Sequence, residues 1–220
     1  MAFLTFDLFS ALIDSRTGAS AALAGLGARH GWRPDGAAVY DEWDARNKAS
    51  QKDTAEWLPF AEHCRRALAG TYRALDLDGD PDVDVEQLLG SVPDWPLWPD
   101  VSDALTALRP HHRLGVLSNV DDAIFARTRV APLMDMADVL TSERLHAYKP
   151  HPDLYLRAVA EGVDVHVPAS ARDTRGALEA GMSVVRVRRP GHSVDPTGPQ
   201  PELEISDLHE LAAALARLQR

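Results

Sequence analysis

Short apolar runs alternate along the chain with longer segments whose apolar residues recur at helical spacing. The short runs predict strands at 3–6, 114–117, 163–167 and 183–187. The longer segments predict helices at 101–108, 154–160 and 174–180, the last of them ended by Gly181. Strands that alternate with helices predict an α/β fold, in which a parallel sheet carries helices on both faces.

Residues 15–92 break this alternation. They are rich in alanine and helical in pattern, with no convincing strand. We therefore expect an α/β core formed by residues 1–14 and 93–220, with a helical insertion at 15–92. The Pro- and Trp-rich stretch around 92–100 is suited to a linker that returns the chain to the core.

Composition places the chain among globular proteins, since 45% of its 220 residues are hydrophobic and 25% are charged. The net charge of −10 disfavours binding to nucleic acid. The sequence contains no apolar run long enough to span a membrane and no basic leader of a signal peptide, so we expect no membrane association. The single cysteine, Cys64, excludes an internal disulfide and fits a reducing cytoplasm.

Two stretches could suggest a metal site, but each lacks residues that such a site needs. The acidic segment 76–86 would place Pro81 and Gln87 where a calcium-binding loop needs its glycine and its last glutamate. His111 and His112 lie in a predicted turn without matching ligands. We therefore expect no metal at either place.

Polar residues follow the predicted strands. They are Asp7, Ser118, Asn119 and Asp173, and Lys149 lies in the loop before the helix at 154–160. The carboxyl ends of parallel strands meet at one edge of a sheet, where ligands bind. This set could support attack by a carboxylate on a small anionic substrate, with a cation and hydrogen-bond donors to stabilise charge. The alternative is that these residues only cap strands and helices.

Four segments, in the order FDLFSALID, VLSN, AYKPHPDLY and RDTRGALEAGM, resemble the four motifs of the haloacid dehalogenase superfamily of hydrolases. The resemblance covers nearly the full length and implies a Rossmann-like core with a helical cap over the active site. It implies that Asp7 is the nucleophile and that Ser118 and Asn119 contact the substrate. It also implies that Lys149 is the active-site cation and Asp173 the acid of the fourth motif.

Departures from the family pattern bear on the reaction. Phosphatases of this superfamily carry a general acid two residues after the nucleophile, where this chain has Phe9. They also usually hold magnesium with a Gly-Asp pair, which is Pro168-Ala169 here. The remaining magnesium ligands would be Asp7, the Phe9 carbonyl and Asp173. A magnesium-dependent phosphatase with degenerate motifs is therefore the alternative, and an inactive binding protein of the same fold is a further one.

The 2-haloacid dehalogenase branch resembles the chain more closely, because its members need no metal and carry an aromatic residue at the position of Phe9. Tyr155 also matches a tyrosine of that branch, which implies a substrate contact. The cap arginine that binds the substrate anion in that branch is Asp44 here, and Arg46 could replace it only if the helix shifts or rotates. We therefore expect a metal-free hydrolase that forms an aspartyl ester with a small organic acid.

Three tryptophans and one histidine are expected to have packing roles. Trp32, Trp43 and Trp57 fall in the insertion, where they could line a pocket or the face of a homodimer. His166 lies in a strand pattern and is expected to be packed rather than catalytic.

Overall fold

One parallel sheet forms the centre of the α/β core in the computed structural model, which describes residues 1–52 and 57–218. Its strand order is β3-β2-β1-β4-β5-β6. The strands are β1 (Phe3–Phe6), β2 (Arg113–Ser118), β3 (Val139–Thr141), β4 (Val165–Val167), β5 (Ser183–Val187) and β6 (Leu203–Ile205). All neighbouring pairs are parallel, which confirms the predicted sheet type.

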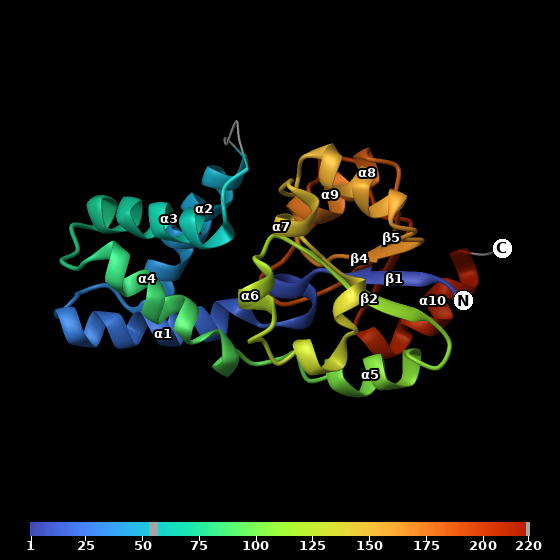
Figure 1. Ribbon diagram of the computed structural model, residues 1–220, viewed down its shortest axis with the longest axis horizontal. Helices are drawn as coiled ribbons and strands as arrows, with labels where there is room; N and C mark the ends of the chain where they lie inside the picture. The colour runs from blue at the N-terminus through green and yellow to red at the C-terminus, as the bar shows by residue number, and fades with distance from the viewer. Residues whose placement is uncertain (53–56, 219–220) are drawn as a thin grey trace.

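Helices cover both faces of the sheet (Figure 1). Side chains alternate across a strand, so Phe3 packs on one face while Leu4 and Phe6 pack on the other. The face of Phe3 is covered by α8 (Pro152–Ala160) and α9 (Ala171–Glu179). The opposite face is covered by α5 (Val101–Leu108) and α10 (Leu211–Leu218), and the short helices α6 (Asp122–Phe125) and α7 (Ser142–Leu145) follow β2 and β3.

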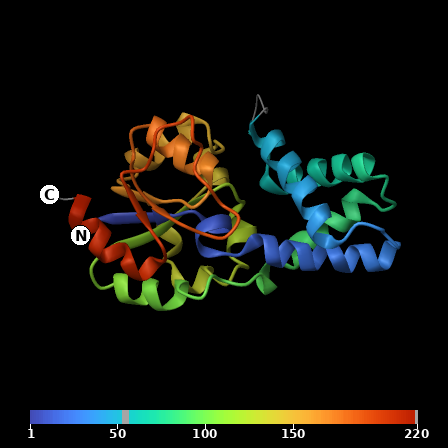
Figure 2. The ribbon, with the colours of Figure 1, turned by 180° about the vertical axis from the view of Figure 1, so that it is seen from behind.

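A lobe of helices lies beside the sheet (Figures 1 and 2). This helical lobe consists of α1 (Ser15–His30), α2 (Gly36–Lys52), α3 (Phe60–Leu75) and α4 (Pro81–Gly90). No strand occurs among the described residues between 15 and 92, as the sequence predicted. Residues 53–56 of the expected insertion lie outside the described residues.

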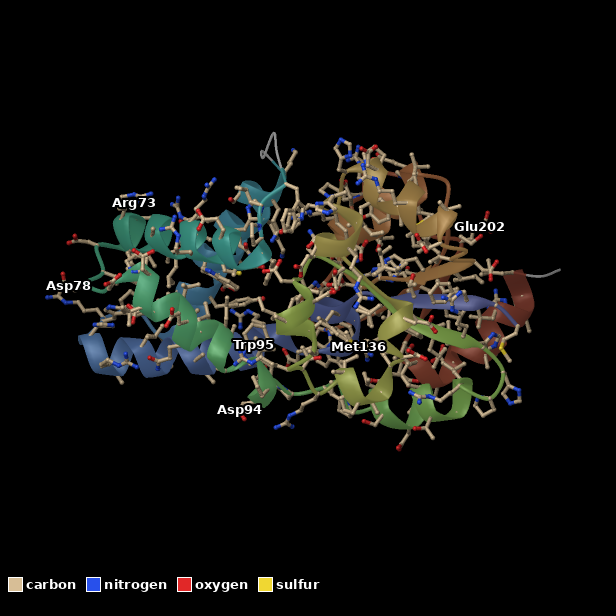
Figure 3. All side chains as sticks on the ribbon, viewed as in Figure 1. Arg73, Asp78, Asp94, Trp95, Met136 and Glu202 are labelled. Carbon is tan, nitrogen blue, oxygen red and sulfur yellow. The ribbon has the colours of Figure 1, made fainter. Side chains whose placement is uncertain are left out.

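Two linkers join the helical lobe to the core side by side. Ile13 and Leu97 form an antiparallel bridge. The Asp14 N–H donates to the Pro96 carbonyl at 2.9 Å, and the Trp98 N–H donates to the Leu12 carbonyl at 3.0 Å. Figure 3 shows Trp95 at this junction, between the sheet and the far end of the lobe where Arg73 and Asp78 lie.

The structure adds two strands that the sequence pattern did not predict. β3 and β6 are three residues each and lie at the two ends of the sheet. Pairing with the neighbouring strand stabilises them, and their own sequence shows no clear strand pattern. None of the described helices is long and apolar enough to cross a membrane.

Candidate active site

A cavity of about 110 Å³ lies where the carboxyl ends of the central strands face the helical lobe. Six of the eight candidate catalytic and substrate-binding residues line it: Asp7, Phe9, Ser118, Asn119, Lys149 and Asp173. They come from segments far apart in the chain, and the parallel topology brings the strand ends to one edge of the sheet.

Asp7 directly follows β1 and is held by four hydrogen-bond donors. Its Oδ2 accepts from the Ser10 N–H at 2.9 Å and from the Ser10 hydroxyl at 2.5 Å. Its Oδ1 accepts from Lys149 Nζ at 3.0 Å and from the Ser118 hydroxyl at 3.4 Å. The residue is 8% exposed, at the floor of the cavity. Its carboxylate is therefore fixed in orientation yet open to a ligand.

The Lys149 ammonium lies between two buried carboxylates. Its Nζ is 3.0 Å from Asp7 Oδ1 and 2.6 Å from Asp173 Oδ2. Buried charges are tolerated when they are paired in this way. Burial of Asp173 favours its neutral form, but Lys149 and His166 outweigh burial and hold the pKa of Asp173 below its usual range. We call Asp7, Lys149 and Asp173 the charge cluster.

His166 belongs to the surroundings of this cluster, which the sequence analysis did not predict. The residue is fully buried, as expected for a packed histidine. Its Nε2 is 3.1 Å from Asp173 Oδ2 and 3.4 Å from Lys149 Nζ. Its Nδ1 is 3.0 Å from the Thr5 hydroxyl. The strand register is what places His166 here, because His166 on β4 pairs with Thr5 on β1, two residues before Asp7.

Tyr155 lies behind the charge cluster rather than in the cavity. It is fully buried, is not among the lining residues, and its hydroxyl donates to Asp173 Oδ1 at 2.9 Å. Burial raises the pKa of Tyr155 well above its usual value, so the phenol keeps its proton. In this position Tyr155 orients Asp173, and the expected substrate contact finds no support in its position.

Arg46 also lies outside the cavity. Its Nε donates to Glu42 Oε1 at 2.6 Å, one turn earlier on α2. A helix turns by about 100° per residue, so the cavity receives a different face of α2. The lining residues from α2 share the helical spacing that could have identified this face: Tyr40, Trp43, Asp44, Asn47, Lys48 and Gln51. The expected role for Arg46 therefore finds no support in its position.

Aromatic rings form the apolar wall of the cavity. Phe9 stacks on Phe60 with ring centroids 5.7 Å apart, and it meets Trp95 at the same distance. Trp43 also lines the cavity, whereas Trp32 and Trp57 do not. Such a wall excludes water and suits the hydrocarbon part of a small ligand.

Three basic residues in the lining were missed by the sequence analysis: Lys48 of α2, Arg172 and His192. Arg172 precedes Asp173 at the start of α9, and His192 comes from the long connection between β5 and β6, which extends towards the helical lobe (Figure 2). Burial lowers the pKa of both residues. Arg172 could have been identified from its place next to Asp173, whereas no local signal marks His192.

The residues present do not fit a magnesium ion. The space between Asp7 and Asp173, which a metal would need, is taken by Lys149 Nζ. The Phe9 carbonyl accepts a hydrogen bond from the Ser15 hydroxyl at 2.6 Å. Magnesium requires near-octahedral oxygen ligands, and no group of three or more His, Cys, Asp or Glu side chains in the described parts of the chain is arranged to hold a metal.

Comparisons with known proteins agree with this fold. A family model described as haloacid dehalogenase-like hydrolase matches residues 1–165. A defluorinating L-2-haloacid dehalogenase is 26% identical, with a TM-score of 0.82 over 98% of this chain and 95% of that one. A 2-haloacid dehalogenase from Pseudomonas syringae pv. tomato is 28% identical, with a TM-score of 0.67 over 99% of both chains.

A third solved structure shares the fold. The L-2-haloacid dehalogenase from Xanthobacter autotrophicus, with chloropropionic acid covalently bound, is 20% identical, with a TM-score of 0.82 over 98% of this chain and 99% of that one. No curated protein sequence matches the chain.

Proposed function

The chain belongs to the haloacid dehalogenase-like hydrolases, and from this premise we propose that it hydrolyses a small 2-haloalkanoate through an ester on Asp7. The observation that carries the proposal is the charge cluster, in which Lys149 Nζ contacts both Asp7 and Asp173 at the floor of an aromatic-walled cavity. Two structural relatives of at least 25% identity are haloacid dehalogenases, which supports the same substrate class.

In the first step, an oxygen of Asp7 attacks carbon 2 of the substrate. A carbon–oxygen ester bond forms, the carbon–halogen bond breaks, and halide leaves with the bonding electrons. Halide needs no proton to leave, so the step requires no general acid. This fits Phe9, whose ring cannot transfer a proton and lies in the apolar wall.

In the second step, water attacks the carbonyl carbon of the Asp7 ester. The acyl–oxygen bond breaks, and one proton of the water passes to the departing alkoxide oxygen while the other passes to solvent. This releases the 2-hydroxy acid and restores the Asp7 carboxylate. Asp173 is the other carboxylate of the cluster and would orient this water. Lys149 and the Ser10 and Ser118 donors would stabilise negative charge on the Asp7 oxygens.

The proposal requires no metal, since the donor set does not fit magnesium. We expect the wild-type protein to release chloride from L-2-chloropropionate in the presence of EDTA. Asp7→Asn should lower the rate by at least about a thousandfold, because it removes the attacking oxygen charge. Chloride release at fixed protein concentration is the measurement.

A matched control makes this test specific. Asp103 is exposed on α5, away from the cavity, and Asp103→Asn makes the same substitution there. The control should keep the wild-type rate, and far-ultraviolet circular dichroism should show both variants folded. Chloride release by Asp7→Asn at the control rate, or none by the wild type from chloro- or bromopropionate, would refute the proposal.

A further inference from the structure

We propose that Arg172 and Asn119 form a carboxylate-binding site at the boundary between the core and the helical lobe. The family resemblance implied an arginine of the helical lobe for the substrate anion, yet that position holds Asp44, and Arg46 points to Glu42. The identity of the ligand, the carboxylate of a small organic acid, rests on the proposed function. The site itself rests on charge, donor geometry and burial.

Arg172 differs from the two lysines of the cavity in that no carboxylate pairs with it among the described residues. Lys48 Nζ pairs with Asp44 at 2.5 Å. Lys149 pairs with both carboxylates of the charge cluster. Arg172 forms no ion pair with a carboxylate in the described parts of the chain. It is therefore the cavity cation whose charge remains for a bound anion.

The guanidinium of Arg172 is fixed by neutral oxygens and keeps one donor free. Its Nη1 donates to the Lys48 carbonyl at 3.2 Å, and its Nη2 donates to the Lys149 carbonyl and to Gln51 Oε1. Its Nε is buried without a partner within the described residues. A buried donor without an acceptor is unfavourable, and a ligand oxygen would satisfy it.

Gln51 marks where a ligand oxygen would lie. Its side-chain oxygen accepts from Asn119 Nδ2 at 2.8 Å and from Arg172 Nη2 at 3.3 Å. Two donors of the core thus converge on one neutral oxygen supplied by α2. A carboxylate oxygen offers the same acceptor with a negative charge, and charge-assisted hydrogen bonds are the stronger ones. A substrate carboxylate would therefore displace the Gln51 oxygen.

The planar fork of arginine favours a carboxylate over a halide as the ligand, because its donors can bind two oxygens at once. Propionate is a suitable probe, since it carries the carboxylate but no leaving group and cannot react. Trp43 and Trp95 line the cavity, so their fluorescence should report binding. The same titration with chloride tests the halide as an alternative ligand.

We expect propionate to bind the wild-type protein and Arg172→Gln to weaken it about tenfold to hundredfold. Arg172→Lys keeps the charge but not the fork, and should give an intermediate loss. Arg66→Gln is the matched control, because it removes an arginine charge on the exposed side of α3, where Arg66 pairs with Glu62. The control should bind propionate as the wild type does.

The outcomes separate this site from the proposed function. Arg172-dependent propionate binding without any chloride release would reject the proposed reaction and keep the carboxylate site. Chloride release with an unchanged KM in folded Arg172→Gln would overturn the site and keep the reaction. Absence of propionate binding to the wild type, or loss of chloride binding alone in Arg172→Gln, would also overturn the site.

Discussion

Asp173 illustrates how neighbours decide the charge of a single buried residue. Burial alone would raise its pKa, but Lys149 Nζ at 2.6 Å and His166 Nε2 at 3.1 Å both favour the carboxylate. Tyr155 adds a hydrogen bond to the other oxygen. The folded protein therefore keeps Asp173 ionised at pH values where an unfolded chain would protonate it.

This pKa shift predicts how stability depends on pH. The pKa of Asp173 is lower in the folded protein than its value of about 3.9 in an unfolded chain. Its stabilising contribution is thus complete above pH ~4 and is lost as the pH falls further, because the unfolded chain then binds the extra proton. The free-energy difference between wild type and Asp173→Asn should shrink from pH 6 to pH 3.

Urea denaturation at several pH values measures this difference. Asp103→Asn repeats the substitution at an exposed position and corrects for the loss of one surface charge. An unchanged difference between wild type and Asp173→Asn across this range would contradict the prediction.

Residue positions that follow directly from the topology were predictable from the sequence. Asp7, Ser118 and Asn119 come directly at or after strand ends, and parallel strands place those ends together. The contacts of His166 and Arg172 were not predictable in the same way, although Arg172 directly precedes Asp173 in the chain. Their contacts depend on strand register and on side-chain direction, which no local pattern encodes.

At the scale of the elements, α1 shows how one helix meets two different surroundings. Gly18 packs against the Trp95 indole, and a Cβ at this position would lie 2.4 Å from Trp95 Cγ. Gly25 lies on the same helix, and a Cβ there would meet nothing within 4 Å. The absence of a side chain is therefore required at Gly18 and serves no packing purpose at Gly25.

The two glycines give a matched pair of substitutions. We expect Gly18→Ala to lower the free energy of unfolding by about 1–3 kcal/mol, because Trp95 has to move from its place beside Phe9. Gly25→Ala should raise it by about 0.5–1 kcal/mol, because alanine is the better helix former. Chemical denaturation of both variants checks the signs, and equal effects would contradict the packing argument.

Secondary structure was predictable where elements are long or fully buried. The helix at 101–108 and the strands at 3–6 and 183–187 have the predicted bounds. β3 and β6 are short edge strands that depend on partners distant in the chain. The residues of α2 that line the cavity recur at helical spacing. The sequence alone does not say which face of an inserted helix meets the core.

At the scale of the whole molecule, a loop of the core holds one end of a helix of the lobe. Asp121 accepts hydrogen bonds from the Phe60 N–H at 2.7 Å and the Ala61 N–H at 3.0 Å, the first residues of α3. Nearby, the Tyr148 hydroxyl donates to the Leu58 carbonyl at 2.6 Å. These contacts hold the start of α3 and the segment before it against the core.

Removing the Asp121 contact should weaken the attachment of the lobe. Burial raises the pKa of Asp121, which offsets part of what its hydrogen bonds contribute. We expect Asp121→Ala to lower the free energy of unfolding at pH 7 by about 1–3 kcal/mol. Asp121→Asn retains one oxygen acceptor and should lose less. Equal stability of Asp121→Ala and wild type in urea would show that these two hydrogen bonds do not stabilise the attachment of the lobe.

The paired linkers have a consequence for how such a protein can be modified. Asp14 and Pro96 are hydrogen-bonded neighbours. The helical lobe is therefore inserted into the core as one long loop whose two ends lie side by side. The entropy of closing a loop grows only slowly with its length, by about 0.6 kcal/mol for each doubling. Lobes of other lengths should therefore close between the same two positions at little entropic cost, while the charge cluster, which belongs to the core, stays in place.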